Sequence, residues 1–333
     1  MRSGDYDALL PTHEQAWLYA AGRQYLRCAR PPVADIHSFD RVQSKIAFAQ
    51  TLDELGLPQP QWCPIHEEGD LAALGFPVWV KAAYSTAGRG VRAAHDLGEA
   101  RTAWTQLSGP GGVMIQCRAP GSYAQVQGVF SHGRLIGAAM SKLLATGVGG
   151  SAAARVSVNH PRAAAALKTL GTHLNWHGGI DLDYFHVGGE PQFIECNPHT
   201  VEPGNAFLAG VNLPEMLLDV ATGADVPDVE RATRAGVRTR STMAIALGTA
   251  EEVSTRRAVL GSVVAAITHR PPLDHTTEML TPMCRDPLSL FPFVFAVGSV
   301  LASPRRITRL AGDTVSDYGV TTAEIDIVRA PQR

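Results

Sequence analysis

The chain has 333 residues, of which 45% are hydrophobic and 18% are charged, a composition typical of a globular protein with two or three packed subdomains. The formal net charge is −2, so no overall field favours nucleic acid or an acidic membrane surface. Five scattered cysteines without CxxC spacing argue against a disulfide framework or a zinc site, and a reducing cytoplasm is the expected location.

Residues 1–39 are predicted to be the truncated remnant of an α/β domain. Residues 7–11 resemble the end of a strand, and Thr12 with Gln15 offers a capping box for a helix that runs to about Leu26. Because a lone strand and helix cannot bury a face, either this piece docks on the domain that follows or the chain lacks its expected start.

The middle of the chain alternates helical and β-rich segments. A helix capped by Ser38 or Asp40 is predicted to end at Gly56. Two β-hairpins are predicted farther on, with turns at residues 131–134 and 187–190. The mixture favours an α+β architecture over regular βαβ repetition.

From about residue 230 onward the chain is predicted to be mostly helical, with an arginine-rich face that is typical of a solvated surface (Arg256, Arg257, Arg305, Arg306 and Arg309). The apolar run at residues 290–302 is too short to span a bilayer and is predicted to be a buried element. No signal peptide is expected, because no basic segment precedes an apolar core at the N-terminus.

The second hairpin carries the strongest chemical pattern. Asp181 and Asp183 share one face of the first strand, and Glu195 and Asn197 share one face of the second. If the hairpin folds about Gly189, Asp183 lies opposite Glu195 and Asp181 opposite Asn197. Converging oxygen ligands suit a hard cation such as Mg²⁺, although a solvated polar strand face would give the same pattern.

A lysine followed by a small-residue loop gives a second pattern. Lys81 ends an apolar strand and precedes the glycine-containing loop at residues 84–90. The lysine supplies charge and the loop supplies backbone N–H donors, which together suit phosphate binding. The loop matches neither a Walker A motif nor a GxGxxG fingerprint, and such loops are also common as simple turns.

In this order and spacing, the patterns resemble the ATP-grasp superfamily, which includes biotin carboxylase, D-alanine–D-alanine ligase and many peptide ligases. The resemblance covers about residues 40–221. It rests on Asp40-Arg41-x-x-Ser44-Lys45 with its helix, the lysine strand 76–81, the glycine loop, the hinge strand 113–117 with Pro120-Gly121, the Glu195-x-Asn197-Pro198 strand, and residues 209–214.

The resemblance implies an ATP-grasp fold, in which two α/β subdomains clasp ATP, over residues 40–228, with 229–333 as a family-specific helical extension. It implies ATP and Mg²⁺ (or Mn²⁺) as cofactors. By position, Lys45 and Lys81 would contact the phosphates, and Gln116, Cys117 and Arg118 would line the adenine pocket. The metal ligands would be Asp183, Glu195 and Asn197.

Three further residues are candidates for catalysis. Lys142 matches a lysine that some ligases of the group aim at the transferred phosphate, and Arg155 sits where relatives place a cationic or polar side chain. An exposed or structural ion pair is the alternative for both. His199, where family members often have arginine, is a candidate substrate contact or general base, and a hydrogen-bonded structural histidine is the alternative.

Other departures from the family pattern affect nucleotide contacts. Cys117 replaces a common hinge glutamate, and Gly121-Ser-Tyr123 replaces the Gly-x-Glu that often supports the ribose. These changes leave the phosphate and metal groups intact.

The implied function is an ATP-dependent ligase that activates a small-molecule carboxylate as an acyl phosphate for attack by an amine, releasing ADP and phosphate. Two alternatives remain: bicarbonate activation of the biotin-carboxylase or carbamoyl-phosphate type, and a non-catalytic nucleotide-binding module. Neither nucleic acid nor a membrane is expected as a partner, and a homodimer through the extra helices is compatible with the sequence.

Overall fold

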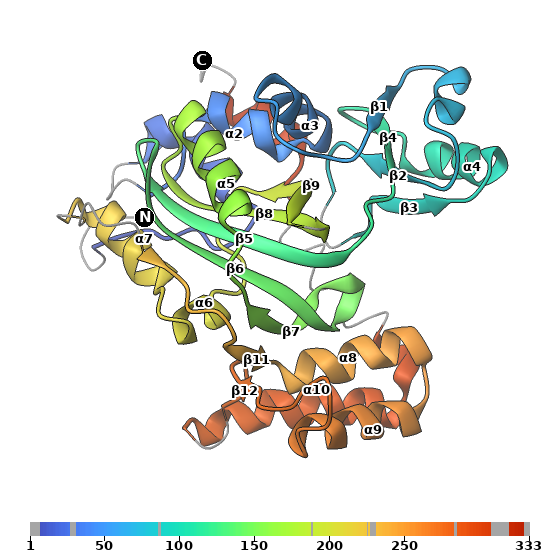
Figure 1. Cartoon of the computed structure of the whole chain (residues 1–333), viewed down its shortest axis with the longest axis vertical. Helices are drawn as coiled ribbons and strands as arrows, with labels where there is room; N and C mark the ends of the chain where they lie inside the picture. The colour runs from blue at the N-terminus through green and yellow to red at the C-terminus, as the bar shows by residue number, and fades with distance from the viewer. Residues whose placement is uncertain are drawn as a thin grey trace.

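The computed structural model describes residues 7–26, 31–85, 88–187, 189–224, 226, 231–282, 285–307 and 320–329. It contains a four-stranded and an eight-stranded sheet with helices packed around them (Figure 1). Most neighbouring strands run antiparallel, so the architecture is α+β, as the sequence predicts.

The small sheet carries a lysine on the face turned away from its own core. Its strand order is β1 (Trp62–Ile65), β4 (Val113–Cys117), β2 (Val78–Ala82) and β3 (Val91–Ala94). Helix α4 (Leu97–Leu107) and the 3₁₀ helix η2 (Glu68–Ala72) contact this sheet and share its apolar core with Val78 and Val80. Because side chains alternate along a strand, Lys81 lies on the opposite face.

The large sheet contains both predicted hairpins. Its main order is β12 (Thr277–Glu278), β11 (Arg238–Arg240), β7 (Ala152–Ser157), β6 (Arg134–Thr146), β5 (Ser122–Ser131), β8 (Gly178–Val187) and β9 (Glu190–Asn197), and β10 (Arg231–Ala232) pairs with β6. Strands β5 and β6 form the first hairpin and β8 and β9 the second.

Helices cover both faces of this sheet. On one face, Trp17, Phe39, Phe48, Phe130 and Trp176 belong to one apolar core. The helices on this side are α1 (Gln15–Ala21), α2 (Ile36–Gln43), α3 (Lys45–Glu54), α5 (Pro161–His173) and α12 (Thr322–Arg329). On the other face, α6 (Gly204–Leu208) and α7 (Leu213–Thr222) pack against part of the sheet, and the remaining part is free to carry polar side chains.

The N-terminal piece docks on the domain that follows, but its predicted elements are partly wrong. Residues 7–11 form no strand, and α1 begins at Gln15 without a side-chain cap and ends at Ala21. A 3₁₀ helix, η1 (Arg23–Tyr25), follows. Tertiary contacts hold this piece against the main domain. Trp17 is buried, and its indole Nε1 donates a hydrogen bond to Asp40 Oδ1 at 3.1 Å.

The single helix predicted from Ser38 or Asp40 to Gly56 is two helices. Asp35 caps α2 by accepting from the backbone N–H groups of His37 and Ser38, at 2.9 and 3.1 Å. The extended backbone of Ser44 ends α2, and its hydroxyl caps α3. Capping residues preferred at helix starts therefore divide the segment, and the break places Lys45 at the first position of α3.

The C-terminal region is mainly helical but is not separate from the sheet. Strands β10, β11 and β12 join the large sheet, while α8 (Thr242–Val253), α9 (Arg256–Ile267) and α10 (Leu290–Ala302) form a layer at its end (Figure 1). Short 3₁₀ helices lie at Val148–Gly150, Pro287–Ser289 and Pro304–Arg306. Arg309 of the predicted arginine-rich face lies outside the described residues.

The prediction that residues 290–302 are buried is wrong for most of α10. Phe293, Val297 and Val300 pack into the core with α8 and α9, but Phe291 and Phe295 are 73% and 70% exposed. Only the side chains at three- and four-residue spacing contact the neighbouring helices, so the other face of this apolar helix is exposed. Among the described residues, no helix combines the length and apolarity needed to cross a membrane.

Gly178, at the start of β8, gives a test of how the N-terminal piece docks. A Cβ at this position would lie 1.8 Å from the Pro32 carbonyl oxygen, and its φ is +102°. We expect Gly178→Ala to lower the free energy of unfolding by at least about 3 kcal/mol, because backbone strain and a clash add. Gly189→Ala is the control: its φ is +91° but nothing lies within 4 Å, so it should cost about 1 kcal/mol. Equal losses in denaturant titrations would contradict this packing.

Candidate active site

A cavity of about 490 Å³ lies over the polar part of the large sheet. Its walls come from β5, β7, β8 and β9, from residues 148–152 and from residues 199–202. Thr12, His13 and Glu14 of the N-terminal piece also line it, as do Ser85 and Gly88 near the glycine loop. The loop residues 86–87 lie outside the described residues. Segments from distant parts of the sequence therefore meet around one polar surface.

The β8–β9 hairpin brings its predicted polar residues to this cavity. Asp181 pairs with Asn197 and Asp183 with Glu195, which is the register expected from the sequence. An irregularity beyond Asp183 leaves Ile194 as an extra residue, so that Tyr184 pairs with Phe193. A β-bulge re-aims the side chains on either side of it. Phe193 thus enters the apolar core while Glu195 lines the cavity.

Both phosphate-binding candidates meet this hairpin. Lys45 Nζ lies 2.7 Å from Glu195 Oε1 and donates to the Ser85 carbonyl oxygen at 3.1 Å. Lys81 Nζ donates to Gln116 Oε1 at 2.6 Å and to the bulge carbonyl of Ile194 at 3.4 Å. Both lysines are buried. Two cationic side chains therefore stand beside the carboxylates, with little water to screen them.

Burial shifts the proton affinities of these charged groups. It lowers the pKa of Lys81 to about 8, and the positive charge of Lys45 adds to the effect, while Glu195 and Asp183 oppose it. Burial, reinforced by the charge of Glu195, raises the pKa of Asp183 to about 6. Asp183 nevertheless accepts a hydrogen bond from Tyr123 Oη at 2.6 Å, and Asn197 Nδ2 lies 3.4 Å from its other oxygen.

Asp181 is the most strongly perturbed carboxylate beneath this face. It is fully buried, and neither carboxylate oxygen has a hydrogen-bond partner among the residues that the structure describes. Burial, with Asp183 nearby, raises the pKa of Asp181 well above its usual value. The charged form of Asp181 is thus poorly compensated here, a condition that a cation would relieve.

The donor set fits a hard cation shared with a substrate. In the described part of the chain, no three His, Cys, Asp or Glu side chains form a metal-binding group by themselves. Mg²⁺ is usually held by one or two carboxylates together with waters and substrate phosphates. Asp183, Glu195 and Asn197 offer carboxylate and amide oxygens on one face, next to an under-compensated Asp181. These residues therefore fit Mg²⁺ in the company of phosphates.

Two predicted catalytic residues line the cavity. Arg155 is buried, donates to Gln125 Oε1, and lies 3.0 Å from the half-exposed Glu202 carboxylate. His199 is also buried, with its Nδ1 3.1 Å from the Thr200 carbonyl and its ring stacked on His13 at 5.5 Å. Burial lowers the pKa of His199, while the Thr200 hydrogen bond opposes the shift. A carbonyl only accepts, so Nδ1 carries the proton and Nε2 keeps its lone pair.

Lys142 lies on the other face of the sheet. It pairs with Ala124, whereas the cavity residue Gln125 pairs with Ser141. The cause is a register shift between Val129 and Phe130 in the pairing of β5 with β6. Without this shift, the register set at the turn would place Lys142 opposite Tyr123. A shift of one residue moves a side chain to the opposite face. The structure therefore does not bring Lys142 to the cavity.

The predicted adenine-binding residues lie at the end of β4, outside the walls of the large cavity. Gln116 is buried and engaged by Lys81, Cys117 is half-buried and Arg118 is exposed. The backbone N–H of Cys117 donates to the Gln61 carbonyl at 2.8 Å, so this group is already occupied. Their role in binding a base stays a prediction.

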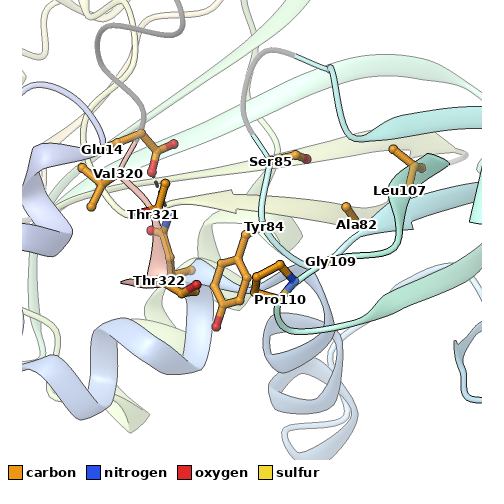
Figure 2. A pocket seen from close by; sticks show the side chains of 11 residues that line it. Glu14, Ala82, Tyr84, Ser85, Leu107, Gly109, Pro110, Val320, Thr321 and Thr322 are labelled. Carbon is orange, nitrogen blue, oxygen red and sulfur yellow. Dashed lines mark hydrogen bonds between the residues drawn. The ribbon is translucent and has the colours of Figure 1, made fainter. Parts of the chain in front are cut away.

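A smaller cavity of about 250 Å³ lies behind the start of the glycine loop. Figure 2 shows Tyr84 between Glu14 and Thr321 on one side and Pro110 on the other. Glu14 and Ser85 line both this cavity and the large one. The N-terminal piece and the segment leading into α12 thus meet beside the lysine strand.

Sequence reasoning missed the residues that support the carboxylates. Tyr123, noted only as a departure from the family pattern, holds Asp183, and Gln125 Nε2 donates to the Tyr123 hydroxyl at 3.4 Å. The alternation of polar residues at 123, 125 and 127 along β5 was the available signal. His13 and Glu14 carried no signal, because only tertiary packing brings them to the cavity.

Several solved structures share this arrangement of elements. The biotin carboxylase of Campylobacter jejuni superposes with a TM-score of 0.59 and 16% identity, covering 67% of this chain and 56% of that one. The biotin carboxylase domain of the Hydrogenobacter thermophilus 2-oxoglutarate carboxylase gives 0.61 and 12%, covering 70% and 57%. The N5-carboxyaminoimidazole ribonucleotide synthetase of Thermus thermophilus gives 0.55 and 18%, covering 70% and 65%.

The chain has the ATP-grasp fold. It spans between 56% and 65% of the length of these three relatives. No protein-family model and no curated protein matches the sequence. At such low identity the likeness concerns the fold alone.

The Lys45–Glu195 pair predicts an effect on stability. We expect Glu195→Gln to lower the free energy of unfolding by about 1–3 kcal/mol, because it leaves a buried ammonium without its counter-charge. Glu68→Gln is the matched control, since it breaks the exposed pair with Arg101 and should leave stability nearly unchanged. Denaturant titrations measure both, and a Glu195→Gln protein as stable as the control would contradict the assigned pair.

Proposed function

We propose that this chain is an ATP- and Mg²⁺-dependent ligase that activates a carboxylate as an acyl phosphate for attack by an amine. The observation that carries the proposal is the meeting of two buried lysines with Asp183 and Glu195 beside the large cavity. Such a cluster supplies what phosphoryl transfer requires, namely fixed positive charge and oxygen ligands for a divalent ion. Residues 40–228 would form the catalytic unit and residues 229–333 an extension of it.

In the proposed reaction the lysines hold the nucleotide phosphates. An arriving phosphate would replace Glu195 as the counter-charge of Lys45, and it would give Lys81, whose pKa burial lowers, an anionic partner beside the neutral oxygens of Gln116 and Ile194. Glu195 is then free for the metal ion. The Hydrogenobacter thermophilus domain was solved with MgADP, which supports nucleotide binding in this fold.

Asp183, Glu195 and Asn197 would hold Mg²⁺ (or Mn²⁺), which when bound supplies charge neutralisation on the phosphates. Arg155 would hold the carboxylate that attacks the γ-phosphorus. His199, whose pKa burial lowers and whose Nδ1 donates to the Thr200 carbonyl, would take a proton from the attacking amine on Nε2. Lys142 has no place in this proposal.

Ligand-induced stabilisation tests nucleotide binding. Mg²⁺-ATP at about a hundred times its dissociation constant should add about 2.7 kcal/mol, which raises Tm by several degrees at this size. We expect the shift to disappear with chelator and in Glu195→Gln, each compared with its own ligand-free melt, and to persist in Glu68→Gln. ADP release across a panel of carboxylates and amines then tests turnover.

The outcomes separate the alternatives. A metal-dependent shift with carboxylate-dependent ADP release supports the ligase. A shift without turnover on any carboxylate, amine or bicarbonate supports a binding module instead. No shift with any nucleotide would overturn the proposal.

The pKa of Lys81 predicts a pH dependence of nucleotide affinity. Below pH 8 the ammonium is charged and attracts phosphate, whereas above pH 8 the free protein holds a neutral amine and must take up a proton on binding. The Kd for Mg²⁺-ATP should therefore rise between pH 8 and 9.5, by up to about tenfold per pH unit. Lys81→Arg, which stays charged, should flatten the profile. Calorimetry in two buffers measures Kd and proton uptake together, and the same slope in both proteins would contradict the assignment.

A further inference from the structure

A third cavity, of about 270 Å³, adjoins the site on the side of the C-terminal region. Arg155 and Glu202 line both this cavity and the large one, so the two spaces meet at this ion pair. Its walls come from β7, residues 203–205, β11, the start of α8, and Met279 with Leu280. Residues of the C-terminal region therefore make up nearly half of the residues that line this cavity.

The surface that this cavity offers is apolar. Ala152, Ala154, Ala244, Met279 and Leu280 line it. Gly204 lies directly under Met279, because a Cβ there would come within 3.1 Å of Met279 Cε. The absence of a side chain at Gly204 thus leaves the Met279 thioether in place as part of the wall.

The polar groups around the cavity already have partners. Asn205 Nδ2 donates to the Val237 carbonyl at 3.1 Å and to Thr239 Oγ1 at 3.0 Å. Ser241 Oγ caps α8 by accepting from the Ala244 N–H at 3.1 Å. Arg240 donates to the Thr276 carbonyl and hydroxyl and lies 3.7 Å from Glu278. With these groups engaged, a bound group inside the cavity would meet carbon atoms.

We propose that this cavity binds the apolar substituent of the carboxylate substrate, with the carboxylate itself at Arg155. The inference rests on the proposed ligase function and names its substrate class: a monocarboxylate with a branched aliphatic or phenyl substituent. A dry apolar cavity of about 150 Å³ is known to accept benzene, so the available space is sufficient. A buried methylene contributes about a fourfold gain in affinity, which favours such substrates over acetate or bicarbonate.

The same geometry gives the C-terminal region a function. Ala244 of α8 and the Met279–Leu280 segment are the walls that would contact the substituent, while the phosphate and metal groups lie on other elements. Changes in these walls should therefore alter which carboxylate binds without altering nucleotide binding.

The test compares four carboxylates with different substituents, and then compares the protein with variants of the cavity wall. Acetate, 4-methylpentanoate, 3-phenylpropanoate and glutarate are titrated into the full chain by ligand-observed NMR. ADP release is measured separately with each carboxylate in the presence of Mg²⁺-ATP and the panel of amines. We expect Kd for 4-methylpentanoate and 3-phenylpropanoate to be at least about tenfold lower than for acetate and glutarate. Ala244→Leu, which fills the cavity, and Leu280→Arg, which charges its wall, should remove that preference.

Leu260→Arg is the matched control for Leu280→Arg. Both leucines are 54% exposed, but Leu260 lies on α9 away from the cavity. The control should keep the preference and the Mg²⁺-ATP shift, and all variants should keep the Mg²⁺-ATP shift if they are folded.

The readouts separate the inference from the function on which it rests. Selective binding without ADP release supports the cavity assignment and overturns the ligase. ADP release that is as fast with acetate and glutarate as with 4-methylpentanoate and 3-phenylpropanoate supports the ligase and overturns the cavity assignment. Binding that does not discriminate among the four carboxylates, or a preference unchanged in Ala244→Leu and Leu280→Arg, also overturns it.

Discussion

The ion pair between Lys45 and Glu195 is the interaction on which the arrangement of the site depends. It joins the first residue of α3 to β9, and it compensates an ammonium that is buried. Charges removed from water must find counter-charges nearby, or the folded state loses stability. Lys81, Asp183 and Asp181 are less well compensated, as their shifted pKa values show. The ligand-free protein thus buries basic and acidic side chains whose charged forms would be stabilised by a bound anion and a bound cation.

The surrounding fold holds this set in place. The bulge at Ile194 turns Glu195 toward Lys45 and at the same time offers the Ile194 carbonyl to Lys81. The buried apolar sides of several helices cover the opposite face of the sheet, which leaves the polar face for the cavity. The ends of the described chain also take part, since Glu14 lies between the large cavity and the one that Thr321 lines. In the proposed function, the phosphate, metal and substrate contacts would lie on different elements of one fold.

Local patterns in the sequence were sufficient to predict the two hairpins and the pairing of their polar residues. The turns at 131–134 and 187–190 and the pairing of Asp183 with Glu195 follow from turn residues and period-two alternation. The bulges could not be predicted, because Ile194 is indistinguishable from any other strand residue. One such irregularity puts Lys142 on the wrong face for the role expected of it. The same limit applies to β10, β11 and β12: strands of two or three residues have no periodicity to detect.

The most direct test of the site is a crystal structure with Mg²⁺ and a non-hydrolysable ATP analogue. We expect phosphate oxygens at hydrogen-bond distance, about 3 Å, from Lys45 Nζ and Lys81 Nζ, with Glu195 turned from Lys45 to the metal ion. A nucleotide bound elsewhere, with the Lys45–Glu195 pair intact, would contradict this expectation.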